Sequence, residues 1–254
     1  MALYHVEAII LRSRDLGEAD RLVTAYSLEE GKLAAVAKGA RRPGSRLAAA
    51  VQPFACARLL LWRGKHLDVV TQGQLLQSLP RLRSHLLGLA AASLLAELVD
   101  SFTQERDPAP SLFALLRGSL AALDETVGEA GRSLEGVAYA FVLGLLALAG
   151  YAPRLTRCVH CGEAPGSGEQ FFDATGGGLV CSRCQRGNRT LRLSEASRRV
   201  LLHLAGCSPR AASRLAVSTA TMDEVRSVVV SCLEARLEAR PRAWDFWYAQ
   251  VGRR

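Results

Sequence analysis

Apolar and polar positions follow two different periods along the chain, and the change falls near Pro80. Before it, short apolar runs are bounded by turn residues, and we expect strands at 4–10, 22–27, 31–38, 53–62 and 67–76. Five short strands within about 75 residues favour a small closed barrel over a sandwich. The five-stranded OB-fold has this strand count and length, so we expect residues 1–79 to form an OB-fold that binds nucleic acid.

From Pro80 onward the leucines recur at helical spacing. The pattern predicts helices over 82–98, 111–123 and 133–150, another that opens at Ser194, and a last one over 222–240, with Ser111, Ser133 and Ser194 as N-caps. We therefore expect a helical bundle in two parts, 80–153 and 191–254, interrupted by a cysteine-rich module at 154–190. The aromatic segment 241–248 is expected to pack back onto this bundle rather than to form a protein-contact patch.

Four cysteines, Cys158, Cys161, Cys181 and Cys184, form two C-x-x-C pairs with nineteen residues between them. Each pair can bind one ion from a tight turn, and the spacing is typical of a structural four-cysteine zinc site. An iron–sulfur cluster, disulfides or free thiols remain as alternatives. Four protein ligands close the coordination shell, which argues against a hydrolytic zinc with an open position. His160, inside the first pair, is expected to be an exposed spacer rather than a fifth ligand.

The expected fold class is thus α+β and multi-domain: an N-terminal OB-fold β-barrel followed by an α-helical bundle with an inserted four-cysteine zinc module. The other three cysteines, Cys56, Cys207 and Cys232, lie in apolar runs and are expected to be buried thiols in a reducing compartment. The first residues lack the basic and apolar regions of a signal peptide. Two apolar segments, 86–99 and 137–152, are shorter than the roughly 20 residues that span a bilayer. We therefore expect core helices there and a cytoplasmic protein without membrane contact.

Charge is distributed unevenly along the chain. The net charge is +8, with +4 in residues 1–80, −3 in residues 81–152 and +7 in residues 153–254. Two basic ends around an acidic middle fit a polyanionic partner, and nucleic acid is the commonest one. Ordinary solvated surface is the alternative interpretation of the same charges.

A basic loop, 38–46, follows the third expected strand and contains glycine and proline. OB-folds commonly bind single strands with such loops, whereas a solvated turn is the alternative. ATP binding is rejected there, because the P-loop lysine and its strand–helix frame are missing. Trp62 or Tyr26 would offer a base-stacking platform, although core positions are the favoured interpretation. The expected nucleic-acid-binding residues are Lys38, Arg41, Arg42 and Arg46, joined by Arg12, Arg14 and Arg21 near the first turn.

Glu18 and Asp20 place two carboxylates in one turn, which is a pattern found in acid–base and magnesium sites. Arg14 and Arg21 surround them, so a salt-bridged hairpin is the favoured interpretation. The sequence contains no serine–histidine–acid order, H-E-x-x-H motif or nucleotide fingerprint. We therefore expect a protein that is not an enzyme, while a metal-dependent repair nuclease using these carboxylates stays open.

The order and spacing of several segments resemble the RecO family of bacterial recombination mediators along nearly the whole chain. At the front, the matching segments are Gly17-Glu18-Ala19-Asp20-Arg21, Gly31-Lys32, 37–42 and Ser45-Arg46. In the middle, 146–153 leads into the first cysteine pair, and Phe171-Phe172 and Gly177-Gly178 precede the second. Lys32, in the matched front segment, is counted with the expected DNA-binding residues.

The resemblance implies an N-terminal OB-fold, a helical domain and an inserted zinc module whose metal serves folding. It also implies binding to single- and double-stranded DNA, annealing of complementary strands, and a complex with RecR. With RecR, such a protein helps to load RecA onto DNA covered by single-stranded-DNA-binding protein, whose acidic C-terminal tail docks on RecO. The expected location is the cytoplasm, at the nucleoid during repair. A zinc-ribbon adaptor of the transcription or translation machinery is the remaining alternative.

Overall fold

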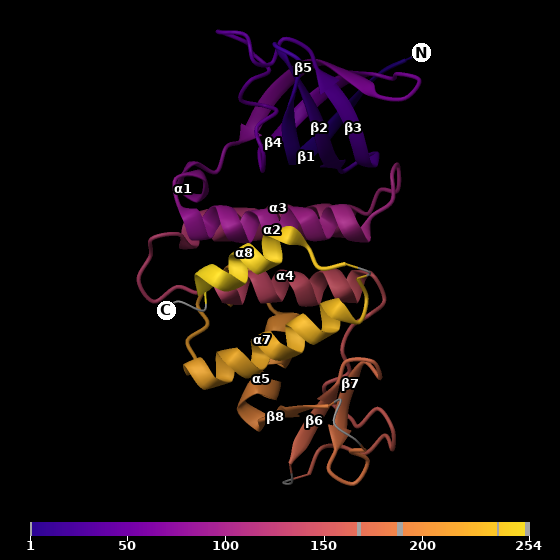
Figure 1. Cartoon of the computed structure of the whole chain (residues 1–254), viewed down its shortest axis with the longest axis vertical. Coiled ribbons are helices and arrows are strands. Elements are labelled where there is room, and N and C mark those ends of the chain that lie inside the picture. Colours follow the sequence, from indigo (N-terminus) through magenta and orange to yellow (C-terminus); the bar gives the residue numbers. More distant parts are fainter. Residues whose placement is uncertain (1, 167–168, 187–189, 238, 252–254) are drawn as a thin grey trace. The chain divides into compact units, whose positions relative to one another are not determined.

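A closed five-stranded barrel forms the N-terminal part of the chain in the computed structural model, which describes residues 2–166, 169–186, 190–237 and 239–251. Its strands are β1 (Leu3–Leu16), β2 (Asp20–Ser27), β3 (Gly31–Ala37), β4 (Cys56–Trp62) and β5 (Asp68–Gln77). They follow the order β1-β2-β3-β5-β4, and β3 and β5 form the parallel pair among antiparallel neighbours. The expected OB-like barrel is confirmed (Figure 1).

The barrel core follows from the two-residue period of its strands. In β3, Leu33, Ala35 and Ala37 are buried while the residues between them are half-exposed. The inward positions are often alanine or valine, whose small side chains fill a narrow five-stranded barrel. A β-bulge in β1 between Ile10 and Arg12 shifts the register with β2, as bulges do where a strand bends around a barrel.

Four helices pack with the barrel as one compact unit, residues 1–128 together with 241–254. They are α1 (Pro80–Arg83), α2 (Leu86–Phe102), α3 (Pro110–Thr126) and α8 (Arg242–Val251). Figure 1 shows α2 and α3 beside one end of the barrel. Helix α8 packs on α2 and buries Trp244 and Trp247, so the expected packing of the aromatic tail is confirmed.

Several helix boundaries differ from the sequence prediction. The single helix expected over 82–98 is split, because α1 ends at Arg83 and α2 begins at Leu86. Helix α3 begins one residue before the expected N-cap Ser111, since Pro110 occupies the first helical turn with a preset φ. The last helix, predicted over 222–240, spans Thr219–Glu234 and has Ala235 as its C-cap.

The second unit, residues 129–240, contains the remaining elements. These are α4 (Leu134–Leu148), β6 (Gln170–Asp173), β7 (Gly178–Cys181), β8 (Leu191–Leu193), α5 (Glu195–Gly206), α6 (Pro209–Ala212) and α7 (Thr219–Glu234). Ser133 and Ser194 cap α4 and α5 as expected, each accepting a hydrogen bond from a backbone N–H three residues on. The module expected at 154–190 contains β6 and β7, which form a three-stranded sheet with β8 just beyond it; residues 167–168 and 187–189 of the module lie outside the described residues. No described helix combines the length and apolar character needed to cross a bilayer.

Candidate nucleic-acid interface and metal centre

The basic loop 38–46 is held against the turn between β1 and β2. The backbone N–H of Gly39 donates to the carboxylate of Asp20 over 2.7 Å, and the N–H of Arg41 donates to the carbonyl of Ala19 over 2.9 Å. The Arg41 guanidinium also donates to the carbonyl of Gly17 over 3.1 Å. These contacts join two loops into one structure at one end of the barrel, so the loop presents its cations from a defined backbone.

Four of the predicted nucleic-acid-binding residues project from this region without a protein partner. Arg14, Lys38, Arg42 and Arg46 are all exposed. Within the part of the chain that the structure describes, none of the four side chains forms a hydrogen bond or an ion pair. Unpaired cations on a fixed loop are able to neutralise phosphates without first breaking an internal salt bridge.

The other four predicted residues are held by acidic or polar groups. Arg21 and Arg41 both pair with Asp15, at 3.6 and 3.3 Å, and line the same turn. Arg12 pairs with Asp100 of α2, and the Lys32 ammonium lies 3.3 Å from the same carboxylate and 2.6 Å from the Asp100 carbonyl. These last two contacts join the barrel to α2, so the structure does not bring Arg12 and Lys32 together with the basic loop.

The carboxylates of Asp15 and Asp20, at the first turn, contact arginine side chains and a backbone N–H. The expected salt-bridged hairpin exists, but its acidic member is Asp15 rather than Glu18 or Asp20. Asp20 instead accepts the hydrogen bond of Gly39. Among the described residues, the four cysteines are the one group of three or more His, Cys, Asp or Glu side chains close enough to hold a metal ion. The turn therefore gives no support to a magnesium-dependent nuclease.

The two aromatic candidates have opposite environments. Tyr26 is fully buried, and its hydroxyl accepts a hydrogen bond from the backbone N–H of Ala109 over 3.0 Å. Trp62, at the end of β4, is 41% exposed. The prediction of a core position is therefore confirmed for Tyr26 and wrong for Trp62. Successive side chains of a strand point to opposite faces, so Trp62 lies on the outer face of the barrel because Leu61 points inward.

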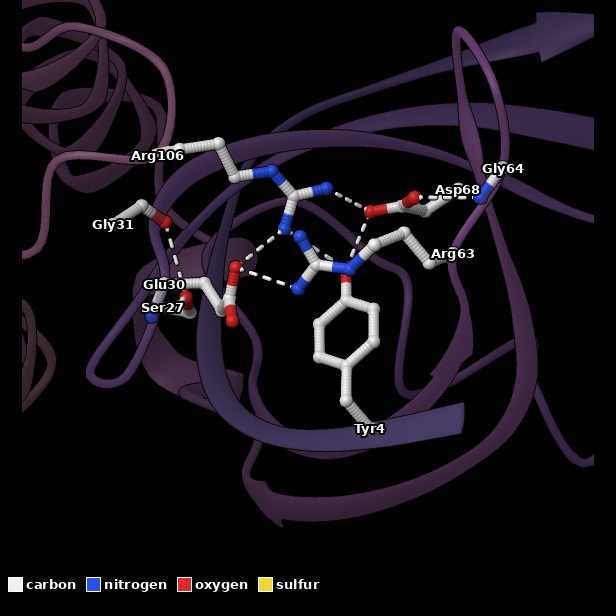
Figure 2. Close-up of polar contacts among 8 residues, drawn as sticks. All are labelled: Tyr4, Ser27, Glu30, Gly31, Arg63, Gly64, Asp68 and Arg106. Atoms are coloured by element: carbon white, nitrogen blue, oxygen red, sulfur yellow. Dashed lines mark hydrogen bonds and ion pairs between the residues drawn. The ribbon is translucent and has the colours of Figure 1, made fainter. Parts of the chain in front are cut away.

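A network of charged and aromatic side chains lies near the turn between β4 and β5, as Figure 2 shows. The Arg63 guanidinium stacks on the ring of Tyr4, 4.5 Å from its centroid, and pairs with Glu30 at 2.9 Å. Arg106 also pairs with Glu30 at 2.9 Å and with the buried carboxylate of Asp68. The network fixes the segment after α2 onto the barrel.

The network shifts two ionisation equilibria. Burial, together with the hydrogen bond that it donates to Asp68, raises the pKa of Tyr4 to about 12. Burial alone would raise the pKa of Asp68, but hydrogen bonds from Tyr4, Gly64 and Arg106 lower it below the usual value for an aspartate. The network therefore keeps Tyr4 neutral and Asp68 ionised at neutral pH. No sequence pattern pointed to this cluster, because Arg106 is distant from the strand residues that it contacts.

The four cysteines of the zinc pattern meet at one point in the second unit. Cys158 and Cys161 lie on a tight turn in which the N–H of Gly162 donates to the Cys158 carbonyl over 2.9 Å. Cys181 is the last residue of β7. A second turn follows it, in which the backbone N–H of Cys184 donates to the carbonyl of Cys181 over 3.0 Å. The Sγ atoms lie within 4.8 Å of one another, and the pair from Cys161 and Cys181 is 3.8 Å apart. The spacing predicted this cluster, and the structure confirms it.

The donor set fits a tetrahedrally coordinated ion. Zinc–sulfur bonds of about 2.3 Å place sulfurs roughly 3.8 Å apart at the corners of a tetrahedron. Burial would raise the pKa of Cys158, but hydrogen bonds from the backbone of Cys161, Cys181 and His160 lower it to about 6. Hydrogen bonds with Cys181 and Cys161 raise the pKa of Cys184 to about 12. Four neighbouring thiolates repel one another, and a bound cation would remove this repulsion.

The remaining cysteines and His160 lie outside this set. All seven cysteines are free thiols, so no disulfide joins the two pairs. Cys56 and Cys232 are buried as expected, while Cys207 is only half-buried. The His160 side chain is 52% exposed and its Nε2 lies 4.0 Å from the carboxylate of Asp173. His160 is thus an exposed spacer, and the candidate metal-binding cluster consists of cysteines alone.

Two family models together match almost the whole chain. The model "Recombination protein O N terminal" matches residues 1–79, and "Recombination protein O C terminal" matches residues 83–245. The first therefore covers the barrel, and the second covers the cysteine cluster and most of the helices.

Similar proteins carry one name. A protein named DNA repair protein RecO from Pelotomaculum thermopropionicum is 45% identical over 184 residues, which cover 72% of this chain and 69% of that one. Proteins of the same name from Symbiobacterium thermophilum and Desulforamulus reducens are 35% and 34% identical over 249 and 247 residues, covering 97% of this chain and 97% and 94% of theirs. With both family models matched and these relatives aligned over nearly their full length, the chain belongs to the RecO family.

Proposed function

We propose that this protein is a DNA-binding and strand-annealing recombination mediator without catalytic activity. The observation that carries the proposal is the group of four exposed, unpaired cations, Arg14, Lys38, Arg42 and Arg46, at the basic loop of the barrel. Membership of the RecO family, whose relatives are named DNA repair proteins, supports the same activity.

Annealing of this kind requires no bond-making group. Two complementary strands repel each other through their phosphates, and cations that neutralise some of those charges lower the cost of bringing the strands together. The bases must stay free to pair, so contacts to the backbone serve annealing better than contacts to base edges. A fixed loop of unpaired arginine and lysine side chains on a barrel meets both requirements.

The partners are proposed from the family resemblance. The protein binds single- and double-stranded DNA, forms a complex with RecR, and helps RecA to load onto DNA covered by single-stranded-DNA-binding protein, whose acidic tail it contacts. It acts in the cytoplasm, at the nucleoid during repair. Cys158, Cys161, Cys181 and Cys184 hold a structural zinc ion, which the closed four-sulfur donor set and the sulfur spacing support.

An annealing assay tests the proposal. Complementary oligonucleotides are mixed without ATP, and we expect the purified protein to accelerate duplex formation at low ionic strength and to lose this effect as salt rises. Arg42→Glu with Arg46→Glu should reduce the acceleration strongly. Arg192→Glu with Arg199→Glu changes the net charge equally, in the second unit, and is the matched control. Pairing at the spontaneous rate with wild-type protein would overturn the proposal, and retention of RNA polymerase or ribosomes instead of RecR would favour the adaptor.

A further inference from the structure

Trp62 is the accessible tryptophan of this chain. The sequence contains three tryptophans, and the other two, Trp244 and Trp247, are only 2% and 1% exposed. Trp62 is 41% exposed on the outside of the barrel. An exposed indole contributes less hydrophobic stabilisation to the fold than a buried one. Its ring is available to contact a ligand that offers a flat apolar surface.

The strand register places Trp62 in a row of apolar side chains on the outer face of the barrel. Trp62 pairs with Leu3 of β1 on one side and with Val69 of β5 on the other. The row continues through the pairs Val69 with Val36 and Val36 with Leu22. Since neighbouring strands lie about 4.8 Å apart, the stretch from Trp62 to Leu22 is roughly 14 Å long. We call Trp62, Val69, Val36 and Leu22 the outer row.

Cations stand at both ends of the outer row. Leu22 pairs with Arg14 of β1, and Lys38 follows Val36 by two residues, immediately after the end of β3. Beside Trp62, the turn between β4 and β5 carries the exposed Lys65. The row itself contains no acidic side chain, and the nearby Asp68 points inward, where it is 3% exposed. This charge pattern suits an anionic chain that carries flat apolar groups.

The turn next to Trp62 is rigid. The N–H of Gly64 donates to the Asp68 carboxylate over 3.0 Å, and the N–H of Arg63 donates to the carbonyl of Ala2 over 3.0 Å. A Cβ atom at Gly64 would overlap the carbonyl of Leu67, so the turn closes tightly. Figure 2 shows the Arg63 side chain directed to Tyr4 and Glu30. The backbone that follows Trp62 is therefore fixed before any ligand arrives, which lowers the entropic cost of binding.

We propose that Trp62 stacks on a base of single-stranded DNA and that the strand follows the outer row toward Lys38 and Arg14. Base stacking on an aromatic side chain tolerates any sequence, and cations along the path neutralise the phosphates. Duplex DNA keeps its bases stacked on each other, so the contact selects the unpaired strand. The inference deepens the proposed DNA binding and rests on it.

Binding of a labelled oligothymidylate to Trp62→Ala tests the inference. Loss of one stacked base should weaken binding roughly five- to hundred-fold, with Trp62→Phe in between. The slope of log affinity against log salt should stay unchanged, because tryptophan neutralises no phosphate. Phe246→Ala, which removes an exposed aromatic ring from α8, is the matched control and should bind like wild type. Circular dichroism would verify that each variant is folded.

Intrinsic fluorescence gives a second readout on the unmodified protein. Oligothymidylate should quench the emission of wild-type protein and leave that of Trp62→Phe unquenched, because only buried tryptophans remain there. Wild-type protein that binds the oligonucleotide without quenching, and as tightly as Trp62→Ala does, would overturn the inference but leave the proposed function intact. If Trp62→Ala instead lost RecR binding at unchanged oligonucleotide affinity, the outer row would be a protein-docking surface. Failure of wild-type protein to bind any oligonucleotide would refute the proposed function itself.

Discussion

The carboxylate of Asp20 accepts a hydrogen bond from the backbone N–H of Gly39, 2.7 Å away, and this contact ties the first turn of the barrel to the basic loop. A residue that sequence reasoning offered as a catalytic carboxylate thus serves to position cations.

Asp20→Ala should destabilise the protein by about 1 kcal/mol and loosen the loop, because the Gly39 N–H loses its charged acceptor. Asp20→Asn keeps a side-chain oxygen and should behave nearly like wild type. Hydrogen exchange of the Gly39 and Arg41 amides measures the loosening, and denaturant unfolding measures the stability. Magnesium-dependent DNA cleavage that both variants abolish would contradict this role and revive the nuclease.

Lys38 and Lys32 form a matched pair for testing which cations meet phosphate. Lys38→Gln should reduce the salt slope of single-strand binding by about 0.7, the contribution of one phosphate contact. Lys32→Gln should leave the slope unchanged and lower stability, because its ammonium is held by Asp100. Fluorescence anisotropy over a range of salt concentrations distinguishes the two. Equal slopes in both variants would remove Lys38 from the interface.

Cys181→Ser should release the metal and destabilise the second unit, since one sulfur of the four is lost. Cys207→Ser changes a thiol outside the cluster and is the control. Metal analysis of the purified proteins together with thermal unfolding measures both effects. A metal-free wild-type protein with a fully folded second unit would show that the cluster needs no ion.

Gly31→Ala should destabilise the first unit by about 3 kcal/mol or more. Gly31 has a φ of 67°, and a Cβ there would overlap the carbonyl of Asp107, which docks the segment after α2 onto the barrel. Gly17 has a similar φ of 59° with open space around it, so Gly17→Ala should cost only about 1 kcal/mol. Chemical denaturation of both variants tests the difference, and equal losses would mean that φ alone accounts for them.

Asp68→Asn should change the acid stability of the first unit. The folded-state pKa of Asp68 is lowered, so its ionisation stabilises the fold above the unfolded-state pKa of about 3.9, and this contribution is lost as pH falls through the folded-state pKa. The variant should be less stable at neutral pH by about 1–3 kcal/mol and should lose less stability on acidification. Urea unfolding at pH 7 and at pH 3 measures both. Parallel pH profiles would show that Asp68 contributes nothing to the acid transition.

Several features could be predicted from residue order. The two-residue alternation in the first 77 residues predicts the barrel, because each strand must bury one face. The serines before α4 and α5 act as N-caps, since this function depends only on local backbone. Helix α3 begins at Pro110, one residue before the predicted start at Ser111, because the φ of proline suits the first turn of a helix.

The sequence by itself determined the cysteine cluster, because two short turns with two thiols each can close on one point without help from distant residues. Only the tertiary structure decided which cations are available. Arg12 and Lys32 look like Lys38 in the sequence, but Asp100, more than sixty residues away, pairs with both and leaves Lys38 free. It also decided the exposure of Trp62, which follows from strand pairing around the barrel. Both outcomes depend on contacts between distant segments, and those contacts form only when the chain folds.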